Sequence, residues 1–151
     1  MPLTLKPPAG ERRFAVPVRV YYQDTDAGGI VFHATYLDFL ERARMEWLRT
    51  LGCPASRLVA EEGCLFIVRA LRLEYLRPAL LDELLDATLA VTAVGGAQFT
   101  LHQTVSGSED CVRAEVNLAC VSASRLRPVR LPARLRTALL DWLPNPSANP
   151  Q

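Results

Sequence analysis

Two aspartates, two glycines and a histidine stand close together in residues 21–33. Asp24 and Asp26 carry carboxylates, which can act as a general base or as a nucleophile. Gly28 and Gly29 permit positive φ angles and allow a ligand to approach the backbone closely. An amphipathic pattern follows, so the unpaired N–H groups of a helix's first turn would point at the same place. The run therefore predicts a site where a carboxylate and an anion-binding group of amides converge.

The same residue types also occur in solvated turns and in metal-binding loops. A calcium loop counted from Asp24 would need an oxygen ligand and a glutamate at the positions that hold Gly28 and Thr35. Zinc sites use closely spaced cysteines and histidines, whereas His33 and His102 are far apart and the four cysteines form no Cys-x-x-Cys pair. The sequence therefore predicts no metal site.

A longer pattern surrounds this run within residues 18–47. It consists of Val18-Arg19-Val20-Tyr21-Tyr22, Asp24-Thr25-Asp26-Ala27-Gly28-Gly29, Val31-Phe32-His33-Ala34, Tyr36 and Glu41-Arg42-Ala43-Arg44. The pattern resembles the hotdog-fold acyl-CoA thioesterases of the 4-hydroxybenzoyl-CoA thioesterase family, and within it most closely the Tol–Pal-associated group. Weaker similarity continues to residue 116. The resemblance implies an α+β hotdog fold, an antiparallel five-stranded sheet wrapped around a long central helix. It also implies hydrolysis of an acyl-CoA thioester to the free acid and CoA.

The resemblance implies a role for each residue of the loop. Asp26 would be the catalytic carboxylate, as nucleophile or general base. The backbone N–H of His33 would polarise the thioester carbonyl, and the His33 side chain and Tyr22 would complete the catalytic site. The other matching positions would contact the substrate: Gly28, Gly29, Val31 and Phe32. CoA enters as part of the substrate, and no separate cofactor is expected.

Other readings of these residues remain open. Asp24 competes for the catalytic role, although it also suits a turn or a helix cap. His33 suits local hydrogen bonding at a helix start, and Tyr22 suits a core position that supports the loop. Glu41 would be the alternative catalytic carboxylate if the loop aspartate proved dispensable, but it can also pair with Arg44 three residues later on the helix surface.

Hydrophobic periodicity predicts the elements around the site. Alternation over residues 16–22 predicts a half-buried strand with Tyr22 on its apolar face, and a 3.6-residue stripe predicts a helix over residues 33–51. A short helical turn is expected at 54–62, and four strands at residues 64–76, 84–94, 98–106 and 111–122. One strand, one long helix and four antiparallel strands give an α+β sheet around a helix.

Residues 64–70 are apolar in both phases of their strand, so this stretch needs a cover on each face. We expect a second copy of the chain to supply it. The resemblance implies the same, with sites at subunit boundaries and dimers or tetramers as the assembly.

Composition limits the remaining possibilities. The chain has 151 residues, half of them hydrophobic, and a formal net charge of +1, which fits one globular domain and gives no indication of nucleic-acid binding. No stretch approaches the roughly 20 apolar residues of a membrane span, and the cytoplasm is expected. We predict an N-terminal extension at 1–13, the thioesterase domain at 14–143 and a disordered tail at 144–151. The four cysteines are expected to be structural.

Two further functions compete with the thioesterase. A binding module of the same fold would hold acyl-CoA or an acyl carrier without turnover, and a hotdog dehydratase would need a different acid–base pair. The acyl group itself is not readable from the sequence. Five arginines near the C-terminus either form a solvated face or contact CoA phosphates: Arg125, Arg127, Arg130, Arg134 and Arg136.

Overall fold

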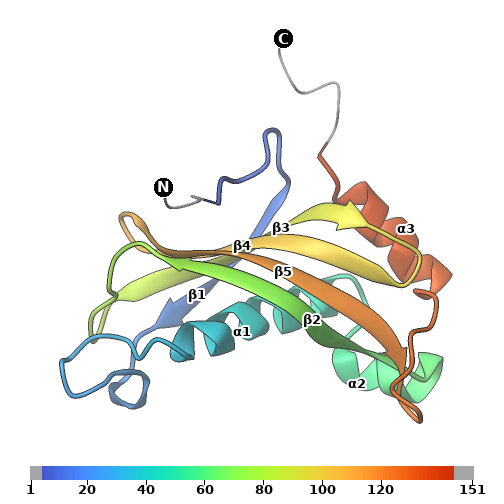
Figure 1. Cartoon of the computed structure of the whole chain (residues 1–151), viewed down its shortest axis with the longest axis horizontal. Helices are drawn as coiled ribbons and strands as arrows, with labels where there is room; N and C mark the ends of the chain where they lie inside the picture. Colours follow the sequence, from blue (N-terminus) through green and yellow to red (C-terminus); the bar gives the residue numbers. More distant parts are fainter. Residues whose placement is uncertain (1–4, 145–151) are drawn as a thin grey trace.

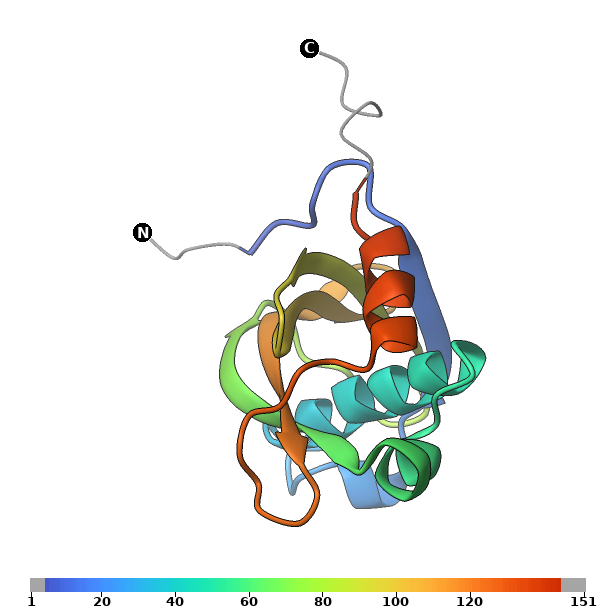
Figure 2. The same ribbon diagram turned by 90° about the vertical axis from the view of Figure 1, so that its right-hand side faces the viewer.

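An antiparallel sheet curves around one helix, which lies against its concave face (Figures 1 and 2). The structure is a computed structural model that describes residues 5–144. The strand order is β1-β3-β4-β5-β2. The main elements are β1 (Arg13–Arg19), α1 (Thr35–Thr50), β2 (Cys64–Tyr75), β3 (Leu84–Val94), β4 (Gln98–Ser106), β5 (Asp110–Ser122) and α3 (Ala133–Asp141). The predicted α+β fold with five strands is confirmed.

The apolar stripe of α1 explains why this helix lies inside the sheet. Its buried side chains are Tyr36, Phe39, Leu40, Ala43, Trp47 and Leu48. Each of the larger ones contributes roughly 1.5–3 kcal/mol by leaving water. The helix has 16 residues, so it begins two residues later and ends one residue earlier than the predicted 33–51. His33 therefore precedes the helix instead of opening it.

The apolar residues at alternating positions of β3, β4 and β5 are buried on the inner face, with one exception. Alternation from Val91 would place Ala93 on this face too, but Ala93 is exposed. The register of β3 against β4 shifts between these two residues, and the extra residue reverses the alternation. Gln103 is a polar residue on the inner face and is fully buried beneath α1.

The first strand ends earlier than its alternation predicted. The chain leaves β1 at Arg19 and turns into the short 3₁₀ helix η1 (Tyr22–Asp24). The carboxylate of Asp24 accepts a hydrogen bond from the Tyr21 N–H at 2.8 Å and fixes this turn. Tyr22 is 84% exposed, so its predicted place on the apolar face is wrong.

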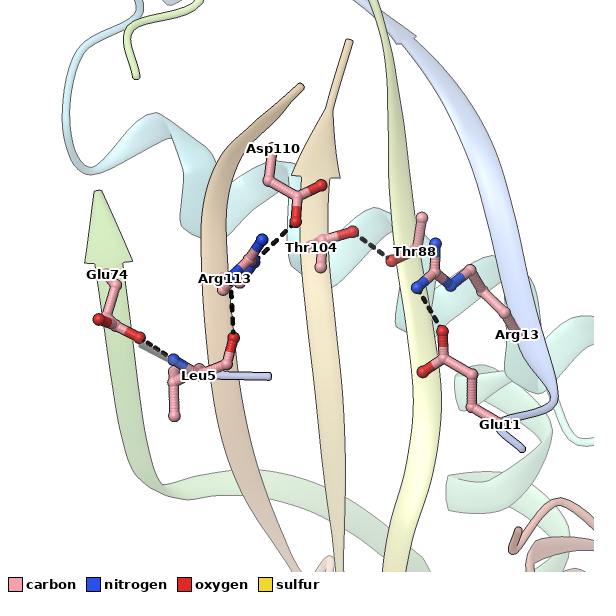
Figure 3. Close-up of polar contacts among 8 residues, drawn as sticks. All are labelled: Leu5, Glu11, Arg13, Glu74, Thr88, Thr104, Asp110 and Arg113. Atoms are coloured by element: carbon pink, nitrogen blue, oxygen red, sulfur yellow. Dashed lines mark hydrogen bonds and ion pairs between the residues drawn. The ribbon is translucent and has the colours of Figure 1, made fainter. Parts of the chain in front are cut away.

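The outer face of the sheet carries a polar group of side chains on the side away from α1 (Figure 3). We call it the outer-face cluster: Glu11, Arg13, His102, Thr104, Asp110 and Arg113. The N-terminal segment before β1 lies across it, because the Arg113 guanidinium donates to the Leu5 carbonyl at 3.4 Å and Leu5 N–H donates to Glu74. Arg113 also pairs with Asp110 at 2.7 Å. This segment helps to bury His102 and Thr104, which are 5% and 2% exposed.

The strand β2 forms an open edge of the sheet. In the part of the chain that the structure describes, β2 pairs with β5 alone, and it presents a row of exposed apolar side chains: Ile67, Val68, Leu71 and Tyr75. Two short elements precede it, α2 (Ala55–Arg57) and the π-helix η2 (Leu58–Glu62). Within residues 5–144 no helix is long and apolar enough to cross a membrane. Of the predicted tail, residues 145–151 lie outside the described part of the chain.

Candidate active site

The loop between η1 and α1 is a tight hairpin tied to the body of the molecule. Thr25 and Val31 form an antiparallel bridge, and the Asp26 N–H donates to the Ile30 carbonyl at 2.9 Å. The Val31 N–H reaches across to the Ala79 carbonyl at 2.9 Å, in the connection between β2 and β3. Backbone hydrogen bonds therefore hold Asp26 at a fixed place in front of α1.

The two aspartates of the loop have different surroundings. Asp24 is 5% exposed, and its carboxylate is used by the Tyr21 N–H. The interpretation of Asp24 as a turn and cap residue is confirmed. Asp26 is exposed, and its Oδ1 accepts a hydrogen bond from the Gly28 N–H at 2.8 Å. Within residues 5–144 no group donates to the other carboxylate oxygen of Asp26.

The paired glycines shape this carboxylate's surroundings. A Cβ on Gly28 would lie 3.2 Å from Oδ1 of Asp26, so a side chain there would crowd the carboxylate. Gly29 has a φ of +78°, which other residues adopt only with strain. Both glycines thus hold Asp26 in place, and neither lines the groove described below.

The start of α1 lacks the usual side-chain cap. Its N-cap residue is Ala34, which cannot accept hydrogen bonds from the first turn, and no side-chain cap bond is formed. Among the described residues, no acceptor lies in hydrogen-bonding position for the N–H of His33 or of Ala34. The helix start therefore offers free N–H donors and the positive end of its dipole.

A groove of about 390 Å³ joins the loop to the end of β2. Asp26, Val31 and His33 line it, as three of the predicted site residues. Phe32 does not line it, but its ring packs on that of His33 with centroids 4.3 Å apart. The groove's other walls are Ile30, Tyr36, Tyr75, Leu76, Arg77 and Pro78.

Tyr75 is a site residue that the sequence analysis did not single out. Its hydroxyl donates to the His33 carbonyl at 2.7 Å. That carbonyl belongs to the same peptide plane as the Ala34 N–H, so the hydrogen bond fixes the direction of a free donor. In the sequence, the apolar run of β2 is followed by an aromatic residue, Tyr75, and then by the pair Arg77-Pro78. This pattern could have indicated that the end of the strand forms a wall of the groove.

Tyr36 is the second tyrosine of the groove and is buried. Its hydroxyl accepts the Ala79 N–H at 3.1 Å. Burial is the main cause that raises the pKa of Tyr36, so the hydroxyl stays protonated at neutral pH. Tyr36 therefore supports the wall of the groove and cannot serve as the base.

The predicted pairing of Glu41 with Arg44 is wrong. Among the described residues these two form no ion pair; Arg44 instead turns inward and donates to Oε1 of Gln103 at 2.9 Å. Gln103 lies 59 positions away in the sequence, so local spacing on the helix could not reveal it. Glu41 is exposed and does not line the Asp26 groove.

None of the four cysteines and none of the five C-terminal arginines lines the groove. All four cysteines are free and buried, as expected of structural residues. Burial raises the pKa of Cys120 to about 12, which makes this thiol a poor nucleophile. The five C-terminal arginines are all exposed.

The five-stranded sheet around α1 is the fold of a known thioesterase structure. The profile of the thioesterase-like superfamily matches residues 20–143, and the chain belongs to this superfamily. The predicted family is thereby confirmed.

Individual relatives agree with this assignment. The chain is 42% identical over 126 residues to the acyl-CoA thioesterase YbgC of Haemophilus influenzae, a match that covers 83% of this chain and 93% of the relative. It is 41% identical over 121 residues to the acyl-CoA thioester hydrolase YbgC of Escherichia coli O157:H7, covering 79% and 90%. A solved probable thioesterase from Bartonella henselae has a TM-score of 0.77 and 36% identity, covering 80% of this chain and 100% of that one. The chain is an enzyme of the thioester hydrolase class.

Proposed function

We propose that this enzyme hydrolyses the thioester bond of an acyl-CoA, with Asp26 as the catalytic carboxylate. One observation carries the proposal: a carboxylate with a free oxygen and a helix start with free N–H donors border the same groove. The names of the two curated relatives support CoA esters as the substrate class.

The arrangement suits attack on a thioester carbonyl. Asp26 would take a proton from water as the water oxygen bonds to the carbonyl carbon. The N–H groups of His33 and Ala34 would stabilise the resulting oxyanion. Collapse of the tetrahedral intermediate breaks the carbon–sulfur bond, and the CoA thiolate takes up a proton. His33 would contribute its side chain at the groove wall, whereas Tyr22 would need a contact beyond this chain to take part.

A nucleophilic Asp26 is the competing mechanism. Attack by its carboxylate would give a mixed anhydride, which water then hydrolyses. We favour the general base, because one carboxylate oxygen is held by Gly28 and the open loop leaves room for water. One turnover in ¹⁸O-labelled water by excess enzyme tests this. Label in the Asp26 peptide would overturn the general base.

An acyl-CoA panel tests the function itself. Purified enzyme is incubated with butyryl-, palmitoyl-, benzoyl- and hydroxyacyl-CoA, and thiol release is measured. Turnover of at least one ester supports the hydrolase. Tight binding without thiol release would instead identify a binding module, and water elimination from the hydroxyacyl ester would identify a dehydratase.

We also propose that hydrolysis needs no metal ion, because the groups described above supply both the base and the donors. Dialysis against a chelator should leave the rate unchanged. Loss of activity that one divalent ion restores would contradict the proposal. The cytoplasm is the proposed location, and four free thiols support a reducing compartment.

The open edge of β2 supports a homodimer as the working form. An exposed apolar edge strand is a template for pairing with another strand, and a second copy would cover Val68 and Leu71. Light scattering should give at least a dimer at micromolar concentration. Leu71→Lys should shift it to monomer, whereas Leu140→Lys, at a similarly exposed position on α3, should not. An active wild-type monomer would contradict a shared site.

A further inference from the structure

A second cavity lies along the same helix, away from Asp26. It has a volume of about 250 Å³ and lies between α1, η2 and the β2–β5–β4 part of the sheet. Its walls are mainly apolar and include Trp47, Leu58, Phe66, Phe99, Leu101 and Leu118. Two charged residues, Glu41 and Arg44, also line it. Nothing in the mechanism above uses this cavity.

An arginine, Arg44, is unusual in the wall of a mainly apolar cavity. A guanidinium has five N–H donors, and among the described residues only Gln103 accepts a hydrogen bond from it. Gln103 is fully buried, and its Nε2 donates to the Leu40 carbonyl at 3.1 Å, so its oxygen is directed to Arg44. Burial is the main cause that lowers the pKa of Arg44, and the charge of Glu41 opposes this shift.

A partly desolvated cation with unused donors calls for an anionic partner. Carboxylate oxygens match the planar guanidinium in charge and geometry. We propose that this cavity binds the far end of the substrate's acyl chain and that Arg44 selects chains that end in a carboxylate. The inference rests on the proposed acyl-CoA hydrolysis and names its substrate class, the CoA monothioesters of dicarboxylic acids.

The size of the cavity limits the chain. A cavity of about 150 Å³ holds one benzene molecule, so 250 Å³ accommodates roughly ten non-hydrogen atoms. This suits a medium-length chain with its terminal carboxylate.

The cavity and the groove lie at different ends of β2. Val68 borders the cavity and Tyr75 borders the groove, about 23 Å apart along an extended strand. Antiparallel pairing of two β2 edges about a twofold axis would bring the start of one β2 beside the end of the other. The groove of each subunit would then lie next to the cavity of its partner. Asp26 and the partner's Arg44 would therefore act on the same bound substrate.

Matched substrates test the selection. Suberoyl-CoA and octanoyl-CoA differ only in the terminal carboxylate, and 8-hydroxyoctanoyl-CoA carries a neutral oxygen at that end. The expected order of kcat/KM in the wild type is carboxylate, then hydroxyl, then methyl. Arg44→Met should lower kcat/KM for suberoyl-CoA on the order of 10- to 100-fold and change octanoyl-CoA little. Arg44→Lys retains the charge and should fall between the two. Arg42→Met removes an exposed arginine of the same helix and is the control.

Binding provides a readout that does not need turnover. Calorimetry with Asp26→Asn and Asp26→Asn/Arg44→Met compares the affinities for suberoyl-CoA and octanoyl-CoA. A loss of suberoyl-CoA affinity confined to the Arg44 variant supports the inference. Equal preference for both esters, unchanged by Arg44→Met, overturns it, even if the enzyme hydrolyses acyl-CoA. If no ester is hydrolysed, the proposed function fails separately while the binding comparison still decides the inference.

Mixed dimers test the placement of Arg44 across subunits. Asp26→Asn and Arg44→Met chains carrying different tags are co-expressed and assayed with suberoyl-CoA. If the residues act across the interface, a mixed dimer has one intact site, and random pairing should restore about one quarter of wild-type activity. If they act within one chain, every site is impaired and the activity stays at the level of the separate variants. That result would overturn the shared site.

Discussion

The Asp26 groove and the outer-face cluster both bring a histidine together with carboxylates, yet only the groove is arranged for a ligand. In the groove Asp26 and His33 are exposed, and one carboxylate oxygen and two backbone N–H groups have no partner in the described chain. On the outer face His102 is buried beside Glu11 and the Arg113–Asp110 pair.

The difference shows which property of a polar cluster indicates chemistry. The ion pairs of the outer-face cluster are covered by their own chain, and the two atoms there that lack a hydrogen-bond partner among the described residues, Oε2 of Glu11 and Nε2 of His102, are buried away from any ligand. Groups that are fixed by the backbone, exposed and left without partners can bind and activate another molecule. Substitutions in the groove should therefore change the rate with little effect on stability. Substitutions in the outer-face cluster should do the reverse.

Asp26→Asn should have the largest effect on the rate. It removes the base while its amide oxygen can still accept the Gly28 N–H, so the loop keeps its shape. We expect kcat to fall on the order of 10²- to 10⁴-fold with an unchanged melting temperature.

Asp24→Asn is the matched control two residues away. The asparagine oxygen can accept the Tyr21 N–H in place of the carboxylate, so we expect activity within a fewfold of wild type. A greater loss of rate in the Asp24 variant than in the Asp26 variant would reverse the assignment. It would also contradict the view that exposed groups in the groove carry the chemistry whereas buried polar groups only stabilise the fold.

Tyr75→Phe should have an intermediate effect. The variant loses the hydrogen bond to the His33 carbonyl, which fixes the peptide that carries the Ala34 N–H. A hydrogen bond of about 1 kcal/mol that matters mainly in the transition state corresponds to a loss of about fivefold in kcat. Tyr21→Phe, at another exposed tyrosine, is the control. A large drop in melting temperature with an unchanged rate would show that Tyr75 only stabilises the fold.

The order of the elements and the position of Asp26 could be predicted because both depend on local patterns. The period of α1 is visible within its own 16 residues, and the Asp26 loop is a contiguous motif. Two of the failures came from contacts between distant segments. Tyr75 lies 42 positions from His33, and Gln103 lies 59 positions from Arg44. Tyr22 was misplaced because alternation continued through a turn that the Asp24 side chain imposes.

His102→Gln should have the smallest effect and should appear only in stability at low pH. Burial is the main cause that lowers the pKa of His102 in the folded chain, with Arg13 and Arg113 in the same direction and Glu11 and Asp110 opposing. At pH 8, well above the ordinary histidine pKa of about 6.5, the residue is neutral in both the folded and the unfolded state, so the free energy of unfolding does not depend on its protonation. Near and below that pKa the unfolded chain binds a proton more readily than the folded chain, and the folded state loses stability. The loss cannot exceed about 1.4 kcal/mol per pH unit, the slope for one proton.

Urea unfolding at pH 8 and pH 5.5 measures this loss. Between the two pH values the free energy of unfolding should decrease less in the His102→Gln variant than in the wild type, while thioesterase activity at pH 8 stays the same. An equal pH dependence in both proteins, or a lower rate in the variant, would contradict the purely structural role of the outer-face cluster.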